Sequence, residues 1–535
     1  MGPSLPIIRH SGRWLVPPDA PWGHFTLGQR YPCLRAAKHR AAYIYSDNLD
    51  KECPLVTPER FFHGLRIDSS HPCSQPWAPD NNGPVATARS NSPDHSRRDS
   101  GEDTHDQAAA GRRSLPGGAA SFIDRERLLA DLDELLRSPS LGGTPAEVDA
   151  QSHLADRWAG EGLEVTTWDI DVDATAARSD FPGMEVKRRS ALGVVARFPG
   201  SGGGRTLLFD GHTDVVPPGD IGAWTGDPFI PRTMPRDGRD VVVARGACDM
   251  KAGLVAAWEA LRAVRRSGVR LRGDVLLCPV SGEEDGGLGT YAALEHLSGT
   301  PIAGCIVPEP TDLDLVPANA GALTFRLTVN GAAIHASRRS EGVSAVEKFV
   351  PVLAALSHLE AVRNASVDEL MQRWPVAYPL SIGTVHAGDW ASTVPDLLVA
   401  EGRLGVALDE SADNARAEFE ATVAEVCRSD AWLREHPVTV QWWGGQFHAG
   451  RTDPNADIVS VVRDTHTRAA GHAPETYGGP YGSDLRLLVG MGGIPTVQYG
   501  PGDTRVAHAP DEYVDIEDVV TCASVLAEVI VDFCS

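Results

Sequence analysis

The stretch Leu207-Leu208-Phe209-Asp210-Gly211-His212-Thr213-Asp214 is an apolar run that ends in a glycine and delivers a histidine and an aspartate two residues apart. A short apolar run of this kind is typical of a buried strand. Alternate residues of a strand share a face, so Asp214 can orient the His212 imidazole while its other nitrogen binds a metal. A loop histidine beside a solvated aspartate explains the pair equally well. The rest of the chain has to decide between the two interpretations.

Length and charge limit the class of protein. The chain has 535 residues, more than one hydrophobic core usually supports, and its formal net charge is −23. No clustered Lys/Arg face is available for phosphates, so nucleic acid is not an expected partner. No apolar run approaches the ~18 residues of a membrane span and no secretory leader is recognisable, so we expect no membrane partner and a cytoplasmic location. Nine cysteines without a Cys-x-x-Cys pattern indicate free thiols.

Residues 1–118 differ from the rest of the chain. They hold 14 of the 39 prolines and show no sustained helical or strand period. The tract 81–118 is rich in Ser, Asp, Arg, Gly and Pro, a composition typical of disorder. We expect either a disordered extension or a start codon assigned upstream of the true one.

From Phe122 onward, apolar patterns predict helices alternating with strands, which favours a mixed, largely parallel α/β sheet. Between residues 323 and 443 the order changes to β-α-β-β-α-β, the split ferredoxin-like unit. The first pattern then resumes. We therefore predict one α/β domain built from residues 119–318 and 446–535, interrupted by an inserted α+β domain over residues 319–445.

Acidic and imidazole side chains recur where the predicted strands end. Open α/β sheets bind ligands at the carboxyl ends of their strands, so these groups should converge on one edge. Two histidines and three carboxylates suit two zinc-like ions that share one carboxylate, and a spare glutamate can take a proton from water. The residues concerned are His212, Asp214, Asp249, Glu283, Glu284, Glu309 and His508.

These motifs resemble those of the M20 family of dinuclear zinc aminoacylases and peptidases, most of all its acetylornithine deacetylase and succinyl-diaminopimelate desuccinylase branch. The resemblance covers the chain from about Phe122 to its end. It implies a zinc-aminopeptidase-like catalytic domain with an inserted lid or dimerisation domain, a homodimer formed through that insert, and two Zn²⁺ ions that Co²⁺ can replace. It also implies roles for individual residues: metal ligation by His212, Asp249, Glu284, Glu309 and His508, orientation of His212 by Asp214, and general-base catalysis by Glu283.

The resemblance makes two further statements about the centre. Asp249 would bridge the two metals, and the peptide bond that follows it would be cis. His335, in the motif Gly331-Ala332-Ala333-Ile334-His335-Ala336-Ser337, would donate a hydrogen bond to the developing oxyanion, in dimeric members from the partner subunit. A surface histidine at a strand end is the alternative for His335.

The chain departs from the branch where substrate is bound. Ser392 stands where the desuccinylase branch has an asparagine before Val-x-Pro, and Gly405 stands where we align the arginine that binds the substrate carboxylate. Arg403 lies two residues earlier on the same strand face and either replaces that arginine or is a solvated or paired residue. Arg486 is either a substrate contact or a structural ion-pair partner.

We therefore expect metal-assisted hydrolysis of an amide bond. The first candidate substrate is an N-acyl amino acid, with N-acetylornithine suggested by the resemblance. A short peptide or a formyl or carbamoyl amide is the second. A non-catalytic metal-binding protein is the alternative from another class, and an intact Glu283 argues against it because a binder needs no base.

Overall fold

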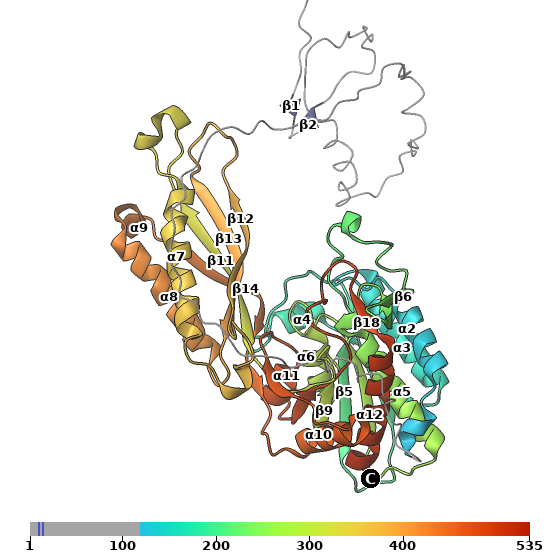
Figure 1. The fold of residues 1–535 in the computed structure, drawn as a ribbon. Helices are drawn as coiled ribbons and strands as arrows, with labels where there is room; N and C mark the ends of the chain where they lie inside the picture. The colour runs from blue at the N-terminus through green and yellow to red at the C-terminus, as the bar shows by residue number, and fades with distance from the viewer. Residues whose placement is uncertain (1–8, 11–12, 15–117) are drawn as a thin grey trace, which may run out of the picture. The chain divides into compact units, whose positions relative to one another are not determined.

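The computed structural model describes residues 9–10, 13–14 and 118–535 (Figure 1). The first two segments are the short antiparallel strands β1 (Arg9–His10) and β2 (Arg13–Trp14). Apart from these strands and Gly118, the extension predicted over residues 1–118 lies outside the described residues. The two expectations for it, a disordered segment or a start codon assigned too far upstream, stay predictions.

A nine-stranded mixed sheet forms the centre of the α/β part (Figure 1). Its order is β15-β10-β17-β9-β5-β8-β4-β3, with β16 paired to β10. The central pairs β17–β9, β9–β5 and β5–β8 are parallel, whereas β4 and β3 add antiparallel strands at one edge. Parallel pairing thus holds at the centre, whereas each edge has antiparallel pairs, and β16 is parallel to β10. The strands are β3 (Glu164–Ile170), β4 (Ala191–Phe198), β5 (Thr206–His212), β8 (Val275–Val280), β9 (Ile302–Val307), β10 (Leu315–Asn319), β15 (Gly450–Arg451), β16 (Thr476–Gly479) and β17 (Thr496–Gln498).

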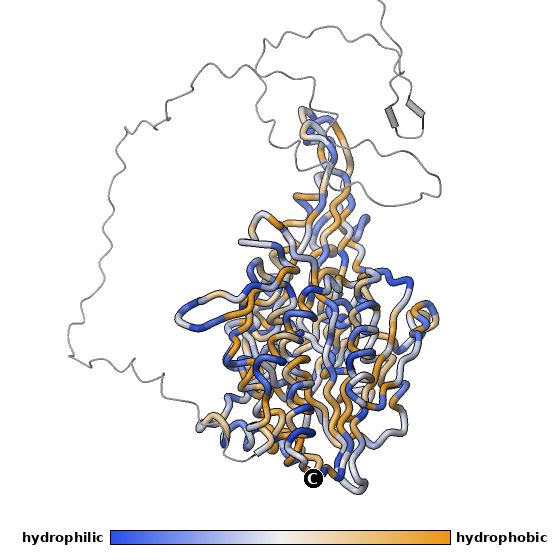
Figure 2. Tube along the Cα trace, turned by 90° about the vertical axis from the view of Figure 1, so that its right-hand side faces the viewer, coloured by the Kyte–Doolittle hydropathy of each residue, from blue (hydrophilic) through white to orange (hydrophobic). Residues whose placement is uncertain are grey.

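Helices cover both faces of this sheet, which explains why β5 reads as an uninterrupted apolar run. Leu207 and Phe209 enter one core, shared with the helices α2, α3, α5, α10 and α12, and Leu208 enters a second core with α6 and α11. Every residue of β5 is buried. The helices are α2 (Arg125–Leu136), α3 (Pro145–Gly160), α4 (Val172–Ala176), α5 (Ala252–Ser267), α6 (Leu288–His296), α10 (Asp457–Ala470), α11 (Leu485–Gly490) and α12 (Ile516–Cys534). In Figure 2 the hydrophobic colour is concentrated along interior strands and helices.

The inserted part has its own antiparallel sheet, in the order β12-β13-β11-β14, and its own core against α7 and α8. Its elements are β11 (Gly321–Asn330), α7 (Ala345–Arg363), β12 (Leu380–Ala387), β13 (Leu397–Val406), α8 (Ala412–Ser429), α9 (Ala431–Glu435) and β14 (Thr439–Phe447). This is the predicted ferredoxin-like unit, and the fold class is confirmed. Ala320 alone separates β10 of the large sheet from β11 of the small one.

A three-stranded sheet, β18-β7-β6, was not predicted as such. It joins β6 (Arg232–Arg236), β7 (Arg239–Val243) and β18 (Tyr513–Asp515). Asp237 and Gly238 connect β6 to β7 with positive φ values of 52° and 80°. Asp-Gly is a typical two-residue hairpin turn, so this dipeptide was the available signal. The sheet anchors the segment that carries His508.

Two expectations from composition can be compared with the described residues. Among them, no helix is both long and apolar enough for a bilayer span. The cysteines in this part of the chain are free, as predicted.

Candidate metal centre

The predicted ligands come from the carboxyl ends of neighbouring strands. His212 is the last residue of β5, Glu283 and Glu284 follow β8, and Glu309 follows β9. Because these three strands are parallel neighbours, their ends meet at one edge of the sheet. Asp249 lies in the short segment Ala247–Lys251 that precedes α5.

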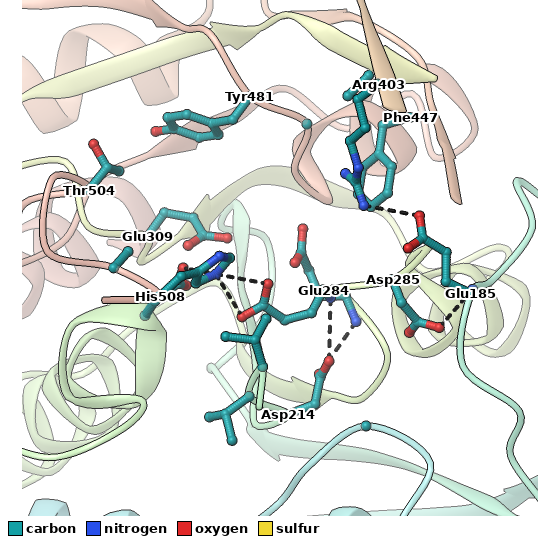
Figure 3. Close-up of a pocket in the computed structure, with 18 of the residues that line it drawn as sticks. Glu185, Asp214, Glu284, Asp285, Glu309, Arg403, Phe447, Tyr481, Thr504 and His508 are labelled. Carbon is teal, nitrogen blue, oxygen red and sulfur yellow. Dashed lines mark hydrogen bonds and ion pairs between the residues drawn. The ribbon is translucent and has the colours of Figure 1, made fainter. Parts of the chain in front are cut away.

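Asp249 occupies the centre of this group. Its Oδ1 lies 3.0 Å from Nε2 of His212 and its Oδ2 lies 3.3 Å from Nε2 of His508. One carboxylate therefore faces a different imidazole with each oxygen, the arrangement required of a carboxylate shared by two metals. Nε2 of His508 also lies 3.1 Å from Oε2 of Glu284 (Figure 3). The peptide bond after Asp249 is cis, as the resemblance implied.

Two sets of potential ligand atoms fit within 4.8 Å of one another: His212, Asp249 and Glu284, and His212, Glu283 and Glu309. Imidazole nitrogens and carboxylate oxygens are zinc ligands. Burial, together with neighbouring carboxylates, raises the pKa of Glu283, Glu284 and Glu309 above the usual range. A cluster of buried acids that repel one another is stabilised by divalent cations. The residues present therefore fit a dinuclear metal centre.

The carboxylates of this cluster also change the pKa of the histidines that they contact. Hydrogen bonds to Asp249 and Glu284 raise the pKa of His508 to about 11. Burial opposes the ionisation of Asp249, but hydrogen bonds to His212 and His508 lower its pKa below the usual range. Because a metal binds the neutral imidazole, loading this centre would release protons.

Asp214 makes two separate connections in this centre. Its main-chain oxygen lies 2.9 Å from Nδ1 of His212, whereas its carboxylate Oδ1 is 4.0 Å from that nitrogen. The carboxylate instead accepts hydrogen bonds from the backbone nitrogens of Glu283 and Glu284, at 3.4 and 3.3 Å. Orientation of His212 by the carboxylate itself stays a prediction. The structure adds a contact to the residue expected to act as base.

A buried ion pair between Arg245 and Glu512, which the sequence analysis did not predict, links the segment that carries Asp249 to the segment that carries His508. Oε1 of Glu512 accepts hydrogen bonds from the backbone nitrogens of Cys248 (2.8 Å) and Asp249 (3.1 Å). Arg245 pairs with Glu512 and donates to the main-chain oxygen of His508 at 3.1 Å. Glu512 lies four residues after His508. This proximity of an acidic residue to a predicted ligand was the one sequence feature that could have indicated its role.

Four of the five metal-ligand candidates, Asp249, Glu284, Glu309 and His508, line a cavity of about 740 Å³ together with residues of the small sheet, whereas His212 does not reach its surface. Glu185, Arg403 and Phe447 lie together in the part of its wall across from Glu309 and His508, whereas Tyr481 lies on the side of Glu309 (Figure 3). Arg403 comes from β13, and its Nη2 lies 3.0 Å from Oε1 of Glu185. The predicted substrate residue is thus in the cavity and is paired.

The remaining predicted site residues lie elsewhere. Arg486 is buried against Phe447, with 3.8 Å between its guanidinium carbon and the ring centroid, and it donates to the main-chain oxygens of Ser483 and Gly286. It does not line the cavity. Its substrate role stays a prediction.

His335 and Ser392 are close to one another in the inserted part but do not line this cavity. Residue 335 forms an isolated bridge with Thr393, and the main-chain oxygen of Ser392 accepts a hydrogen bond from the backbone nitrogen of Ala336. Nδ1 of His335 lies 2.8 Å from Oγ of Ser337. Within a single chain the structure therefore does not bring these two residues to the metal ligands, and their roles stay predictions.

Curated proteins are similar to this chain over about two thirds of its length. An acetylornithine deacetylase of Myxococcus xanthus is 30% identical over 381 residues, which cover 68% of this chain and 92% of that protein. The N-formyl-4-amino-5-aminomethyl-2-methylpyrimidine deformylase of Bacillus subtilis is 29% identical over 356 residues, covering 62% and 80%.

Solved structures share the fold. The crystal structure of a tripeptidase from Staphylococcus aureus covers 77% of this chain and 99% of its own, with a TM-score of 0.60 and 20% sequence identity. The model of peptidase family M20/M25/M40 matches residues 208–532, more than half of the chain and the whole of the ligand set. This chain therefore belongs to peptidase family M20/M25/M40, a family of metal-dependent hydrolases that act on amide bonds.

Proposed function

We propose that this protein is a dinuclear zinc deacylase that hydrolyses the amide bond of a small N-acyl compound. The observation that carries the proposal is the position of Glu283, whose carboxylate lies within 4.8 Å of ligand atoms of His212 and Glu309. A protein that only stores or senses metal has no use for a general base beside the five other ligand candidates.

When bound, two zinc ions, for which cobalt can substitute, supply the positive charge that polarises the amide carbonyl and acidifies water. His212, Asp249, Glu284, Glu309 and His508 would hold them. Glu283 takes the proton from the attacking water and returns it to the leaving amine. Asp214 keeps the Glu283–Glu284 segment in place through its hydrogen bonds to both backbone nitrogens.

The oxyanion donor of this reaction is His335, which we propose reaches the cavity from the inserted part of a second copy. Two surface features support a homodimer through this part. β12 is an edge strand of the small sheet. Val346, Val350 and Leu353 follow one face of α7 at helical spacing and are exposed. An unpaired edge beside an exposed apolar stripe is suited to pairing with a second copy.

For the substrate, an N-acyl amino acid is the first candidate, and acetylornithine deacetylation is its most specific form, since that name is carried by a relative 30% identical to this chain. A specific observation favours a second candidate, an N-formyl amide of an amine without a carboxylate: Arg403, the cavity's guanidinium, is paired with Glu185. The deformylase name of another relative agrees with this candidate.

The test is a hydrolysis screen on the full chain loaded with zinc or cobalt. The panel comprises N-acetyl, N-succinyl and N-formyl amino acids, N-formyl amines and dipeptides. We expect release of acid and amine from at least one class, about two zinc ions per chain, and loss of activity on chelation. Glu283→Gln should bind the same metal and lose roughly 10²–10⁴-fold in kcat.

Glu425→Gln is the matched control, because Glu425 is an exposed glutamate paired only with the nearby Arg428. It should turn over like the wild type. Two bound zinc ions without hydrolysis of any compound in the panel would indicate a metal-binding protein instead. Retained turnover in Glu283→Gln would refute the assignment of the base.

A further inference from the structure

The wall of the cavity opposite the carboxylate cluster holds a paired arginine and glutamate. Oε1 of Glu185 accepts hydrogen bonds from Nη2 of Arg403 at 3.0 Å and from Oγ1 of Thr324 at 2.8 Å. Arg403 is on β13 and Thr324 on β11, and the two residues are opposite each other in register. Glu185, from the segment between α4 and β4, therefore binds two neighbouring strands of the small sheet (Figure 3).

Glu185 is held in this position from behind. Its backbone nitrogen donates to Oδ2 of Asp285 at 3.0 Å, and Asp285 pairs at 2.7 Å with Arg188, whose side chain is fully buried. Gly444 makes room for the side chain: a Cβ there would lie 2.5 Å from Cγ of Glu185. The Arg403 and Glu185 side chains are 41% and 26% exposed, but the backbone of Glu185 is anchored and its carboxylate has a second partner in Thr324, so the pair is more restrained than an isolated surface ion pair.

The same wall offers no second cation. Among the described residues that line the cavity, Arg403 is the sole lysine or arginine. Position 405, two residues along the same strand face, cannot supply another. A Cβ at Gly405 would lie 2.7 Å from the carbonyl carbon of Tyr378 and 2.9 Å from the nitrogen of Pro379, both of them backbone atoms. Among the described lining residues, Arg403 therefore carries the charge that can attract an anionic group to this wall, and Glu185 is paired with it.

We propose that Glu185 determines the charge selectivity of the cavity. By pairing with Arg403 it makes this wall suitable for the uncharged end of an N-acyl compound and unfavourable for an end that carries a free carboxylate. To pair with Arg403, a substrate carboxylate must displace the carboxylate of Glu185. That carboxylate belongs to the same chain and is therefore present at a high effective concentration beside the guanidinium. The negative charge of Glu185 also repels the substrate carboxylate, so Glu185 selects against compounds that carry a free carboxylate. The inference rests on the proposed deacylase function and, of its two substrate candidates, favours the N-formyl amide without a carboxylate over the N-acyl amino acid.

The test compares two compounds that differ only in charge, an N-acetyl amino acid and its α-carboxamide. In Glu185→Gln, which keeps the size of the side chain and removes its charge, the ratio of kcat/KM for the acid to that for the amide should rise roughly five- to tenfold. The rise should come from KM of the acid. It should vanish when Arg403→Gln is added, because the gain requires the released guanidinium. Glu425→Gln, which makes the same change of charge at an exposed glutamate paired with Arg428, is the control and should not change the ratio.

Binding measured by calorimetry in a Glu283→Gln background separates this inference from the proposed function. There both compounds bind without being cleaved, so the acid-to-amide ratio of Kd reports on Glu185 even if the wild type hydrolyses neither. The inference would be overturned if Glu185→Gln left the ratio of Kd unchanged, or if the shift were equally large in the double variant with Arg403→Gln. Failure of the amide to bind would also overturn it. Absence of hydrolysis in the zinc-loaded wild type, with the predicted shift in Kd, would instead overturn the proposed function alone.

Discussion

Asp214 accepts a hydrogen bond from the backbone nitrogen of Glu283, at 3.4 Å, and a parallel one from Glu284 at 3.3 Å. The main-chain oxygen of the same aspartate lies 2.9 Å from Nδ1 of His212. One residue thus connects the histidine at the end of β5 to the glutamate pair that follows β8. Its loss should affect both metal affinity and the position of the base.

We therefore expect two measurable effects of Asp214→Ala. Alanine keeps the main-chain contact with His212, but zinc affinity should still fall roughly 10–100-fold, the usual cost of removing a group that positions a ligand, because the carboxylate holds the backbone of Glu284. At saturating zinc, kcat should also fall, because the Glu283–Glu284 segment has lost its acceptor. Zinc titration and kcat at saturating metal check the two effects separately. Wild-type kcat at saturating zinc would mean that the contact with Glu283 has no role in the reaction.

Glu512→Gln should lower both the unfolding free energy and the zinc affinity of the protein. Arg245 and Glu512 are 1% and 0% exposed, and removal of one charge leaves the other buried and unpaired. Such a loss costs about 3–5 kcal/mol of unfolding free energy. Zinc affinity should fall as well, because Glu512 holds the backbone nitrogen of Asp249. Denaturant unfolding of the zinc-free protein and a zinc titration measure the two quantities.

The exposed pair Arg428–Glu425 provides the comparison for this prediction. Glu425→Gln should change the unfolding free energy by less than about 1 kcal/mol. Equal effects of the two substitutions would show that burial of the Arg245–Glu512 pair has no energetic consequence.

The sequence predicts well whatever depends on local pattern. The buried run of β5, the acids after β8 and β9 and the β-α-β-β-α-β order of the insert all follow from residues close together in the chain. The partners that hold the site do not. Glu512 binds the backbone of Asp249 from 263 residues away, and Arg403 meets Glu185 across 218 residues. Periodicity reports which face of an element is apolar, but these contacts depend on how distant loops meet, so Glu185 and Glu512 were not recognised.

Asp312 should make stability depend on pH. Although Asp312 is an exposed residue, partial desolvation of its carboxyl and the like charges of Asp518, Asp503 and Asp314 raise its pKa to about 6, above its ordinary value of 3.8. A carboxyl whose pKa is raised on folding contributes most stability below about pH 4 and loses that contribution as the pH rises through about 6. Asp312→Asn should therefore raise Tm at pH 8 and leave it nearly unchanged at pH 4. Scanning calorimetry at the two values measures this.

Asn suits the left-handed backbone of this position, where φ is 58°, so the substitution introduces no strain. Asp237→Asn is the matched control, because Asp237 has a similar φ of 52° in the exposed turn between β6 and β7. A gain in Tm that is equal at pH 8 and pH 4 would assign the effect to the backbone and not to the charge.

His335 gives the last prediction, which concerns the proposed dimer. His335→Ala should lower kcat roughly 10²–10³-fold, as expected for loss of an oxyanion donor, without loss of zinc. Because His335 does not line the cavity of its own chain, the donor should come from the partner subunit. If so, inactive His335→Ala and inactive Glu283→Gln chains should complement each other when dissociated and mixed. Random pairing of equal amounts then restores about a quarter of the wild-type sites, because only mixed dimers contain one site with both groups. Exposed His472, replaced by alanine, is the control for the single substitution. A mixture as inactive as its components, with mixed dimers demonstrated by mass spectrometry, would place His335 in the site of its own chain or outside the reaction.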